Sequence, residues 1–281
     1  MSRRYRTPGQ DALETLTSLV EMGRELTGSE KVEAVSYGFG GTVRRPDQRP
    51  GPCFHEPGWE SVDALRYLQD AFKAPVFIEN DCNLAALGEA HYGIRETEGT
   101  LFYATIGTGI GGGIVHRGSL LQSGPLGEAE IGHFVINEEG PECPCGNRGC
   151  LETFCSGPGL SRLASEMLGS SIGSETLMQR FRKRDPRATE VAERAANYLG
   201  KAFALVINLL SPQVIVIGGG VMTDNHAFLE LIANRTEPYV FPFFRGRTRF
   251  YLSALGENVV CQGAAVYAIQ QLAGQKESQT T

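Results

Sequence analysis

The sequence contains no hydrophobic run long enough to cross a membrane, no apolar leader and no excess of positive charge. Its 281 residues are 41% hydrophobic and 21% charged, with a formal net charge of −6 at pH 7. A membrane-spanning helix needs about 20 mostly apolar residues, and no stretch approaches that length. The basic residues at 1–6 are followed by polar residues instead of the apolar segment of a signal peptide. Because the charge balance is acidic, no broad basic face is expected, which argues against a nucleic-acid partner.

Cysteine is also scarce, yet three of the seven cysteines lie close together. Cys143, Cys145 and Cys150 follow the spacing C-x-C-x-x-x-x-C, with glycines inside the loop and His133 a short distance upstream. Three thiolates and one imidazole can fill the tetrahedral shell that zinc prefers. Because four protein ligands leave no open position for water, the pattern predicts a structural zinc ion that holds the loop in place.

Two other interpretations of these cysteines are weaker. Ordinary buried thiols beside a surface histidine seldom cluster as C-x-C next to glycines. A disulfide between Cys143 and Cys145 would close a ring too small for normal bond geometry. An odd number of cysteines grouped around a metal motif is typical of a reducing compartment, so a cytoplasmic location is expected.

The same stretch carries two longer motifs, E-I-G-H at 130–133 and C-P-C-G-N-R-G-C-L-E at 143–152. Together they resemble the signature of the ROK family of sugar kinases and sugar-responsive repressors, although the chain has Ala129 where the usual family form has glycine. The resemblance implies that His133 and the three cysteines bind zinc, and that Glu130, Glu152 and the second ring nitrogen of His133 face sugar hydroxyls. A sugar is held by a rigid array of donors and acceptors, and a metal-bound loop supplies that rigidity.

A second cluster of polar residues follows an expected strand at 75–78. It reads E-N-D-C-N-L-A-A-L-G-E over 79–89. Catalytic groups are common where a strand ends and a helix begins, although an aspartate there can also be only a helix N-cap. The run resembles the family pattern E-N-D-x-N-x-A-A-L-G-E, which implies that Asp81 is the general base and that Asn80 binds the sugar.

The stretch G-F-G-G-T-V at 38–43 follows an expected strand at 32–37. It resembles the sugar loop of the family, G-x-P-G-x-V-D, and this resemblance implies a sugar contact at Gly41. Gly40 stands in place of the proline and Arg44 in place of the acid. Because of these two differences, the loop does not predict which sugar is bound.

Two glycine-rich stretches are candidates for nucleotide binding. Backbone N–H groups of a glycine loop can close around phosphate oxygens, but glycines also form plain turns between strands. The pattern T-x-G-T-G-I-G from Thr105 resembles the second phosphate loop of actin-like ATPases, and a glycine run after a strand at 213–217 has the place of the family's adenosine loop. The ATP contacts that the resemblance implies are Thr105, Gly107, Thr108, Gly109, Gly111, Gly218, Gly219 and Gly220.

The resemblance implies an α/β fold of the actin-like ATPase (ribonuclease H-like) type with two lobes. We expect a small N-terminal lobe over 1–95 together with a C-terminal helix at about 260–275, and a large C-terminal lobe over 96–259 that carries the zinc loop. Helices are expected at 11–26, 160–168, 174–181 and 188–210, where apolar residues recur at helical spacing.

Family members open with D-x-G-G-T, the first phosphate loop, and this sequence contains no such motif. The first lobe is therefore expected to be incomplete, with an open edge on the strand at 32–37. We favour a start-site error, in which the natural protein is longer. A truncated, inactive homologue and a strand supplied by another segment are the alternatives.

These features predict an ATP-dependent kinase that phosphorylates a hexose or N-acetylhexosamine, by family analogy at the hydroxyl on carbon 6, with Asp81 as the base. The expected small-molecule partners are the sugar and ATP with Mg²⁺, alongside the structural Zn²⁺. No membrane or nucleic-acid partner is expected, and a homodimer would be in keeping with the family. The alternative is a non-catalytic sugar-binding pseudokinase, or a sugar-sensing ROK homologue that has lost the first phosphate loop.

Overall fold

The computed structural model describes residues 11–51 and 57–278, and the basic stretch at 1–6 lies outside them. None of the helices in this part of the chain is both long and apolar enough to cross a lipid bilayer. The helices and strands of the described residues are, in chain order, α1 (Ala12–Thr27), β1 (Val35–Phe39), β2 (Val43–Arg44), β3 (Arg49–Pro50), α2 (Ala64–Phe72), β4 (Val76–Asn80), α3 (Asp81–Gly88), β5 (Thr100–Ile106), β6 (Ile110–His116), β7 (Ser119–Leu120), α4 (Leu151–Cys155), α5 (Gly157–Leu168), α6 (Ser174–Arg182), α7 (Pro186–Leu210), β8 (Val214–Gly218), α8 (His226–Thr236), β9 (Arg249–Leu252) and α9 (Val259–Ser278).

A five-stranded sheet with the order β7-β6-β5-β8-β9 forms the centre of the molecule. β5 runs antiparallel to β6 and parallel to β8, and β8 runs parallel to β9. Side chains alternate between the two faces, as the period of a strand requires: Phe102 and Ile106 of β5 enter one core, whereas Leu101 and Tyr103 enter another. Every residue of β8 is buried, which is typical of a parallel strand covered on both faces.

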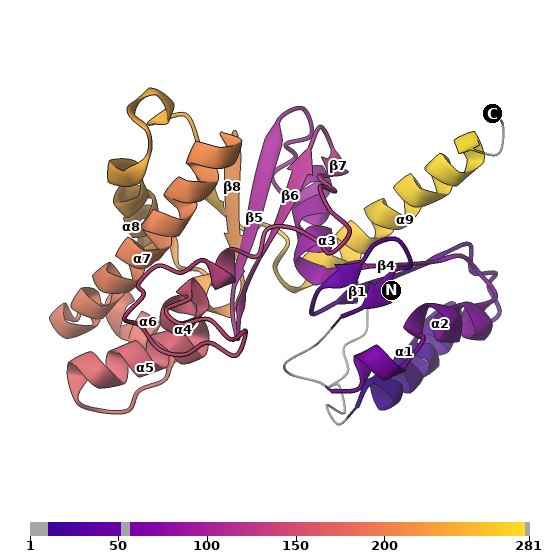
Figure 1. Ribbon diagram of the computed structural model, residues 1–281, viewed down its shortest axis with the longest axis horizontal. Helices are drawn as coiled ribbons and strands as arrows, with labels where there is room; N and C mark the ends of the chain where they lie inside the picture. The colour runs from indigo at the N-terminus through magenta and orange to yellow at the C-terminus, as the bar shows by residue number, and fades with distance from the viewer. Residues whose placement is uncertain (1–10, 52–56, 279–281) are drawn as a thin grey trace.

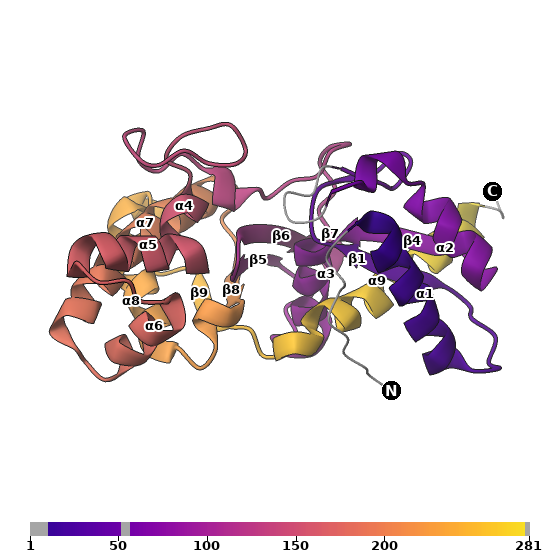
Figure 2. The same cartoon turned by 90° about the horizontal axis from the view of Figure 1, so that it is seen from below.

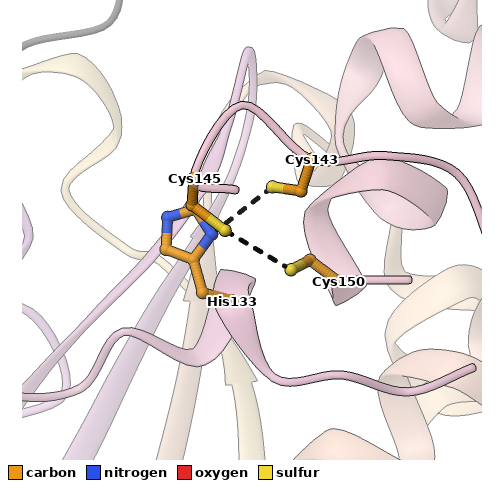
Figure 3. A group of neighbouring side chains, drawn as sticks. All are labelled: His133, Cys143, Cys145 and Cys150. Atoms are coloured by element: carbon orange, nitrogen blue, oxygen red, sulfur yellow. Dashed lines mark hydrogen bonds between the residues drawn. The ribbon is translucent and has the colours of Figure 1, made fainter. Parts of the chain in front are cut away.

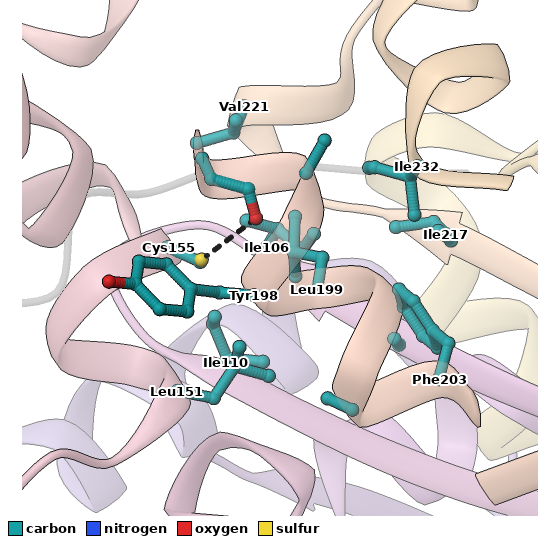
Figure 4. Packing of buried hydrophobic residues seen from close by; sticks show 14 of the residues in the cluster. Ile106, Ile110, Leu151, Cys155, Tyr198, Leu199, Phe203, Ile217, Val221 and Ile232 are labelled. Atoms are coloured by element: carbon teal, nitrogen blue, oxygen red, sulfur yellow. Dashed lines mark hydrogen bonds between the residues drawn. The ribbon is translucent and has the colours of Figure 1, made fainter. Parts of the chain in front are cut away.

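α7 supplies the largest helical surface on one face of this sheet (Figure 1). The carboxylate of Asp185 caps its first turn by accepting hydrogen bonds from the backbone N–H groups of Arg187 and Ala188, at 3.0 and 3.1 Å. Its inward face packs Leu199 and Phe203 against strand and α4 residues (Figure 4). The core on this side of the sheet therefore also anchors α4, the helix that directly follows the cysteine motif.

β1 and β4 form a separate, parallel two-stranded sheet in which Val35 pairs with Val76. α1 and α2 cover one of its faces, and their apolar side chains surround the buried Trp59 and Phe39. Within the described residues β1 has β4 as its only strand partner. Residues 11–51 and 57–278 place no strand beside the second edge of β1.

α3 and α9 lie between the two sheets (Figures 1 and 2). Two glycines allow the helices to cross closely. A Cβ on Gly263 would lie 1.6 Å from the carbonyl oxygen of Leu84, and one on Gly88 would lie 2.4 Å from that of Val259. Because no larger residue fits at this crossing, α3 lies close against α9.

Most expected elements are present with shifted ends. The strand expected at 32–37 is β1 at Val35–Phe39, and the helix expected at 188–210 starts earlier, at Pro186. Within the expected helix at 11–26, Leu13 is 51% exposed. Ala12, Thr15, Leu16 and Val20 form the buried stripe of α1 instead.

Candidate functional site

Asn80 is the last residue of β4, and Asp81 is the first residue of α3. The Asn80 side-chain oxygen accepts hydrogen bonds from the N–H groups of Cys82 and Asn83, at 2.9 and 3.1 Å, so Asn80 is the N-cap of α3. Its amide nitrogen donates to the carbonyl oxygen of Gly41 at 3.0 Å. Asn80 thus ties the expected sugar loop to the start of α3.

Asp81 is the first residue of α3, and Asn80 is its cap, so the N-cap explanation does not apply to the Asp81 carboxylate. One of its oxygens accepts a hydrogen bond from the Cys82 N–H at 2.8 Å. Burial raises the pKa of Asp81, and hydrogen bonding to Cys82 offsets only part of this effect. A carboxylate with a raised pKa is a stronger base than an exposed aspartate.

The loop between β7 and α4 gathers His133, Cys143, Cys145 and Cys150 (Figure 3). The four potential ligand atoms all lie within 4.8 Å of one another. The Cys143 sulfur is 3.7 Å from His133 Nδ1, and the Cys145 and Cys150 sulfurs are 3.7 Å apart. With Zn–S bonds of about 2.3 Å, the sulfur–sulfur edges of a tetrahedral zinc site measure about 3.8 Å, so this cluster fits a zinc ion.

Glycines give the cysteine loop its tight path. Gly146 and Gly149 have positive φ angles of 95° and 75°. A Cβ on Gly149 would lie 1.7 Å from the carbonyl oxygen of Asn137. Because Nδ1 of His133 faces the sulfur of Cys143, Nε2 is the ring nitrogen left for the cavity that His133 lines. The same residue can therefore serve a metal on one side and a bound molecule on the other.

Glu152, in the first turn of α4, reaches the hairpin between β5 and β6. Its carboxylate accepts a hydrogen bond from the N–H of Ile110 at 2.8 Å. The turn itself is closed by a 2.9 Å bond from the Gly107 N–H to the carbonyl oxygen of Gly109. The helix that follows the metal cluster is thus joined directly to the expected phosphate loop.

The glycine run after β5 is shorter as a loop than expected. Gly107, Thr108 and Gly109 form the turn of an antiparallel hairpin, whereas Gly111, Gly112 and Gly113 belong to strand β6. The glycines in β6 allow α3 to pack closely against this strand. A Cβ on Gly111 would lie 2.6 Å from the sulfur of Cys82, and a Cβ on Gly113 would lie 2.5 Å from the carbonyl oxygen of Cys82. Gly107, Thr108 and Gly109 therefore form a hairpin turn, and the same three residues remain candidates for phosphate binding.

A cavity of about 590 Å³ brings most of the expected site residues together. All of the expected sugar ligands line it, and so do Thr105 and the hairpin glycines. The expected site residues that line this cavity are Gly41, Asn80, Asp81, Thr105, Gly107, Thr108, Gly109, Gly111, Glu130, His133, Cys145 and Glu152. Residues from five separate segments thus meet around one space.

The last glycine run lies beside this cavity and not in its wall. Gly218, Gly219 and Gly220 line a neighbouring cavity of about 840 Å³ that also contains Asp81 and Thr105. Gly220 lines a further cavity of similar volume together with Gly107 and Thr108. Residue 219 is suited to glycine for two reasons: its φ is 91°, and a Cβ there would lie 2.4 Å from the carbonyl oxygen of Ile106.

Sequence reasoning missed one wall of the cavity that joins Gly220 to the hairpin. Ser174, Glu175 and Arg182 of α6 line it, as do Thr223 and Asp224 after β8. α6 was expected as a helix, but nothing in its sequence indicates a binding role. Only the fold brings it next to the glycine turn.

Acidic side chains dominate the electrostatics of the smaller cavity. Glu130 is exposed as a residue. The protein around its carboxyl group still displaces water, and this desolvation raises the pKa of Glu130. His133 opposes this rise, while the charges of Glu152 and Asp81 add to it. Three carboxyl groups and an imidazole thus line the smaller cavity.

The family model described as the ROK family matches residues 1–271. The chain belongs to the ROK family. It is 32% identical over 278 residues to a glucokinase from Halalkalibacterium halodurans, covering 92% of this chain and 84% of that protein. It is also 27% identical over 212 residues to a xylose repressor from Bacillus spizizenii, covering 75% of this chain and 55% of the repressor. Both kinases and regulators are thus among its ROK relatives.

Solved structures of ROK proteins share its architecture. The ROK hexokinase from Thermus thermophilus has a TM-score of 0.80 and 29% identity, covering 96% of this chain and 90% of that one. The ROK glucokinase from Streptomyces griseus, solved in complex with glucose and AMPPNP, has a TM-score of 0.78 and 27% identity, covering 94% and 90%. The expected actin-like ATPase fold is therefore confirmed for this ROK chain.

Proposed function

We propose that this chain is an ATP-dependent sugar kinase that phosphorylates the carbon-6 hydroxyl of a hexose or N-acetylhexosamine. The observation that carries the proposal is the shared cavity in which Asp81 meets Glu130, His133 and Glu152 beside the glycine hairpin. The similarity to glucokinases supports sugar phosphorylation as the class of reaction.

The sugar would be held by Glu130 and Glu152 near the metal loop and by Asn80 at the junction of β4 and α3. Glu130 and Glu152 accept hydrogen bonds from sugar hydroxyls, and Nε2 of His133 adds a third polar contact. Asn80 uses one amide hydrogen on Gly41, which leaves its second hydrogen for the sugar. Because α4 packs into the main core, Glu152 is a fixed ligand rather than a mobile one.

Asp81 would remove the proton from the attacking hydroxyl. The freed oxygen forms a bond to the γ-phosphorus of ATP while the bond to the leaving ADP oxygen breaks on the opposite side. The N–H groups and hydroxyl of Thr108 and its neighbours stabilise the negative charge on the transferring group, and magnesium enters as part of the MgATP substrate. The raised pKa of Asp81 matches its role as the proton acceptor.

We propose that His133, Cys143, Cys145 and Cys150 hold one structural Zn²⁺. The zinc would fix the loop and the tautomer of His133 and take no part in the transfer. We also propose two lobes, residues 1–95 with the helix at about 260–275 and residues 96–259, which close on the sugar so that water does not compete for the phosphate. The free thiols of the described cysteines fit the expected reducing, cytoplasmic environment.

The test is a direct assay of the purified chain against a panel of sugars. Glucose, N-acetylglucosamine, N-acetylmannosamine and kanosamine are incubated with MgATP, and ADP release and the position of the phosphate are measured. Calorimetry with each sugar, with and without AMPPNP, accompanies the assay. We expect binding and 6-phosphorylation of at least one sugar. Sugar binding without any nucleotide binding would instead support the pseudokinase, and the absence of both would overturn the proposal.

A further inference from the structure

A buried cluster of charged side chains lies directly behind the candidate sugar cavity. Its centre is Arg45, which follows β2 and is 13% exposed, and its acids are Glu79 and Glu128, which are 2% and 8% exposed. The guanidinium donates to both oxygens of Glu128, at 2.7 and 2.5 Å, and to Glu79 at 3.4 Å. Burial disfavours the charged form of Arg45, but Glu128 and Glu79 outweigh it and raise the pKa of this side chain.

Asn83 binds the same two acids from the side of α3. Its amide nitrogen donates to Glu79 at 3.0 Å and to Glu128 at 3.4 Å. Arg45 is also tied to the loop that contains Glu128, because its side chain donates to the carbonyl oxygen of Gly124 at 2.9 Å and its backbone N–H donates to that of Pro125 at 2.9 Å. One arginine therefore joins three segments that are distant in sequence.

Each segment in this cluster continues directly into the candidate sugar site. Arg45 comes four residues after Gly41, Glu79 immediately precedes Asn80, and Glu128 lies two residues before Glu130. A carboxylate oxygen of Glu79 accepts a hydrogen bond from the Asn80 N–H at 2.8 Å. None of Arg45, Glu79 and Glu128 lines the cavity itself. The cluster is thus placed to set the spacing of the sugar ligands without touching the sugar.

We propose that Arg45 is a positioning residue that sets the distance between the Asn80–Asp81 corner and Glu130 through its two-pronged contact with Glu128 and its contact with Glu79. This inference rests on the proposed function. A planar guanidinium can bind both carboxylate oxygens at once, whereas a lysine ammonium binds as a single point charge. The distance between the two halves of the sugar site therefore depends on the shape of the arginine as well as on its charge.

The experiment compares R45K, R45M and E128Q with the wild-type chain. Calorimetry measures the Kd of whichever of glucose, N-acetylglucosamine, N-acetylmannosamine and kanosamine the wild type binds most tightly, and steady-state kinetics measures KM for that sugar and for MgATP. We expect R45K, the mildest change, to raise the sugar Kd about tenfold or more, because small displacements of a binding group carry large costs. The KM for MgATP is expected to remain at the wild-type value.

Two control variants separate positioning from general destabilisation. R235M breaks the exposed ion pair between Arg235 and Glu193, whose nitrogen–oxygen distance is 3.4 Å. Neither residue lines the cavity, so R235M is expected to change neither the KM for sugar nor the KM for MgATP. Val20→Ala makes a cavity in the core beneath α1 and lowers the melting temperature without altering the sugar Kd. All variants are compared at a temperature at which circular dichroism shows each of them folded.

The outcomes distinguish this inference from the proposed function. A wild-type chain that neither binds nor phosphorylates any sugar removes the proposed function and the inference together. If the wild type binds sugar and R45K and E128Q bind it equally well, only the positioning role is overturned. The same holds if both variants raise the KM values for sugar and for MgATP to a similar extent. If R45M does not fold, R45K and E128Q, which keep the side-chain volume, still decide the question.

Discussion

The carboxylate of Glu152 accepts a 2.8 Å hydrogen bond from the backbone N–H of Ile110. This bond joins the helix after the cysteine cluster to the strand that leaves the glycine hairpin. A proposed sugar ligand and a proposed phosphate loop are therefore parts of one rigid unit, since α4 packs into the same core as β5 and β6. A substitution in the hairpin should therefore change the affinity for the sugar.

Gly109→Ala tests this connection. A Cβ at residue 109 would lie 2.6 Å from the Glu152 carboxylate, so the carboxylate must move. Because the displaced atoms are the end of a flexible side chain, the free energy of unfolding should fall by no more than about 1 kcal/mol. The sugar KM should rise about tenfold or more.

The matched control for Gly109→Ala is Gly274→Ala in α9. A Cβ at Gly274 meets no atom within 4 Å, and alanine favours the helix. This variant should keep the wild-type sugar KM. An unchanged sugar KM in Gly109→Ala as well would show that Glu152 does not set sugar affinity from its observed position.

Asp81→Asn tests the general base. Asparagine keeps the shape of the side chain but cannot accept the proton, so kcat should fall by about 10²- to 10⁴-fold. The Kd of the sugar, measured by calorimetry, should change little because the other ligands remain. Asp63→Asn is the control: Asp63 is the N-cap of α2, and asparagine caps equally well. Turnover by Asp81→Asn at the wild-type rate would rule out the base assignment.

The pH profile of kcat/KM for the sugar should reflect the burial of Asp81. Burial raises the pKa of this carboxyl, and only the ionised form can accept a proton. Activity should therefore be lost as the pH falls through the raised pKa, and the loss should begin above the range of an ordinary aspartate, about 3.9. The profile is measured from about pH 4 to pH 9, with circular dichroism at each pH to verify folding.

Glu130 needs a separate control in the pH experiment, because its pKa is raised as well. Glu130→Gln removes its titration from the pH profile of kcat/KM. An acidic limb that persists in Glu130→Gln does not arise from Glu130 and supports its assignment to Asp81. A limb that disappears in this variant would assign the pH dependence to sugar binding by Glu130 instead.

Short-range motifs explain why much of the candidate site could be predicted. His133 and the three cysteines, and separately Asn80 and Asp81, lie within short stretches whose spacing reflects one local geometry. The chemistry of those residue types then limits what they can bind. The actin-like fold followed from the family resemblance that these motifs carry, and the comparisons confirm it.

Contacts between distant segments could not be predicted in the same way. Gly111 is expected in the phosphate loop, but it belongs to β6 and packs against Cys82 of α3, a contact that the sequence does not reveal. Arg45 and Glu128 are 83 residues apart and form no motif. Arg182 reaches its cavity only because α6 folds back beside the glycine turn. Each of these features depends on which surfaces meet, and that depends on the packing of the whole chain.

Cys145→Ser tests the metal cluster. Elemental analysis should find about one zinc per wild-type chain and much less in the variant, because a hydroxyl is a poor zinc ligand. Loss of the metal should lower the free energy of unfolding by about 3 kcal/mol or more and raise the sugar KM, since His133 and the loop lose their anchor. Cys261→Ser is the control, because Cys261 is an exposed free cysteine on α9. Full-strength sugar binding by a zinc-free Cys145→Ser chain would contradict the anchoring role.

Ala129→Gly should stabilise the protein. Ala129 has a φ of 66°, in the left-handed region that a residue with a Cβ adopts only with strain, and the usual family form has glycine here. Glycine relieves the strain, and the gain should exceed the entropic cost of a more flexible unfolded chain by about 1 kcal/mol. Urea unfolding measures the difference.

An alanine-to-glycine substitution elsewhere in the chain should lower the stability of the protein instead of raising it. Ala265→Gly, at an exposed position inside α9, should destabilise the protein by about 1 kcal/mol, as glycine does in helix interiors. If Ala129→Gly also destabilised it, residue 129 would not hold the left-handed conformation in solution. The path of the chain from Glu128 to Glu130 would then differ from the one described, and the spacing that the Arg45 cluster imposes on Glu130 would have to be reconsidered with it.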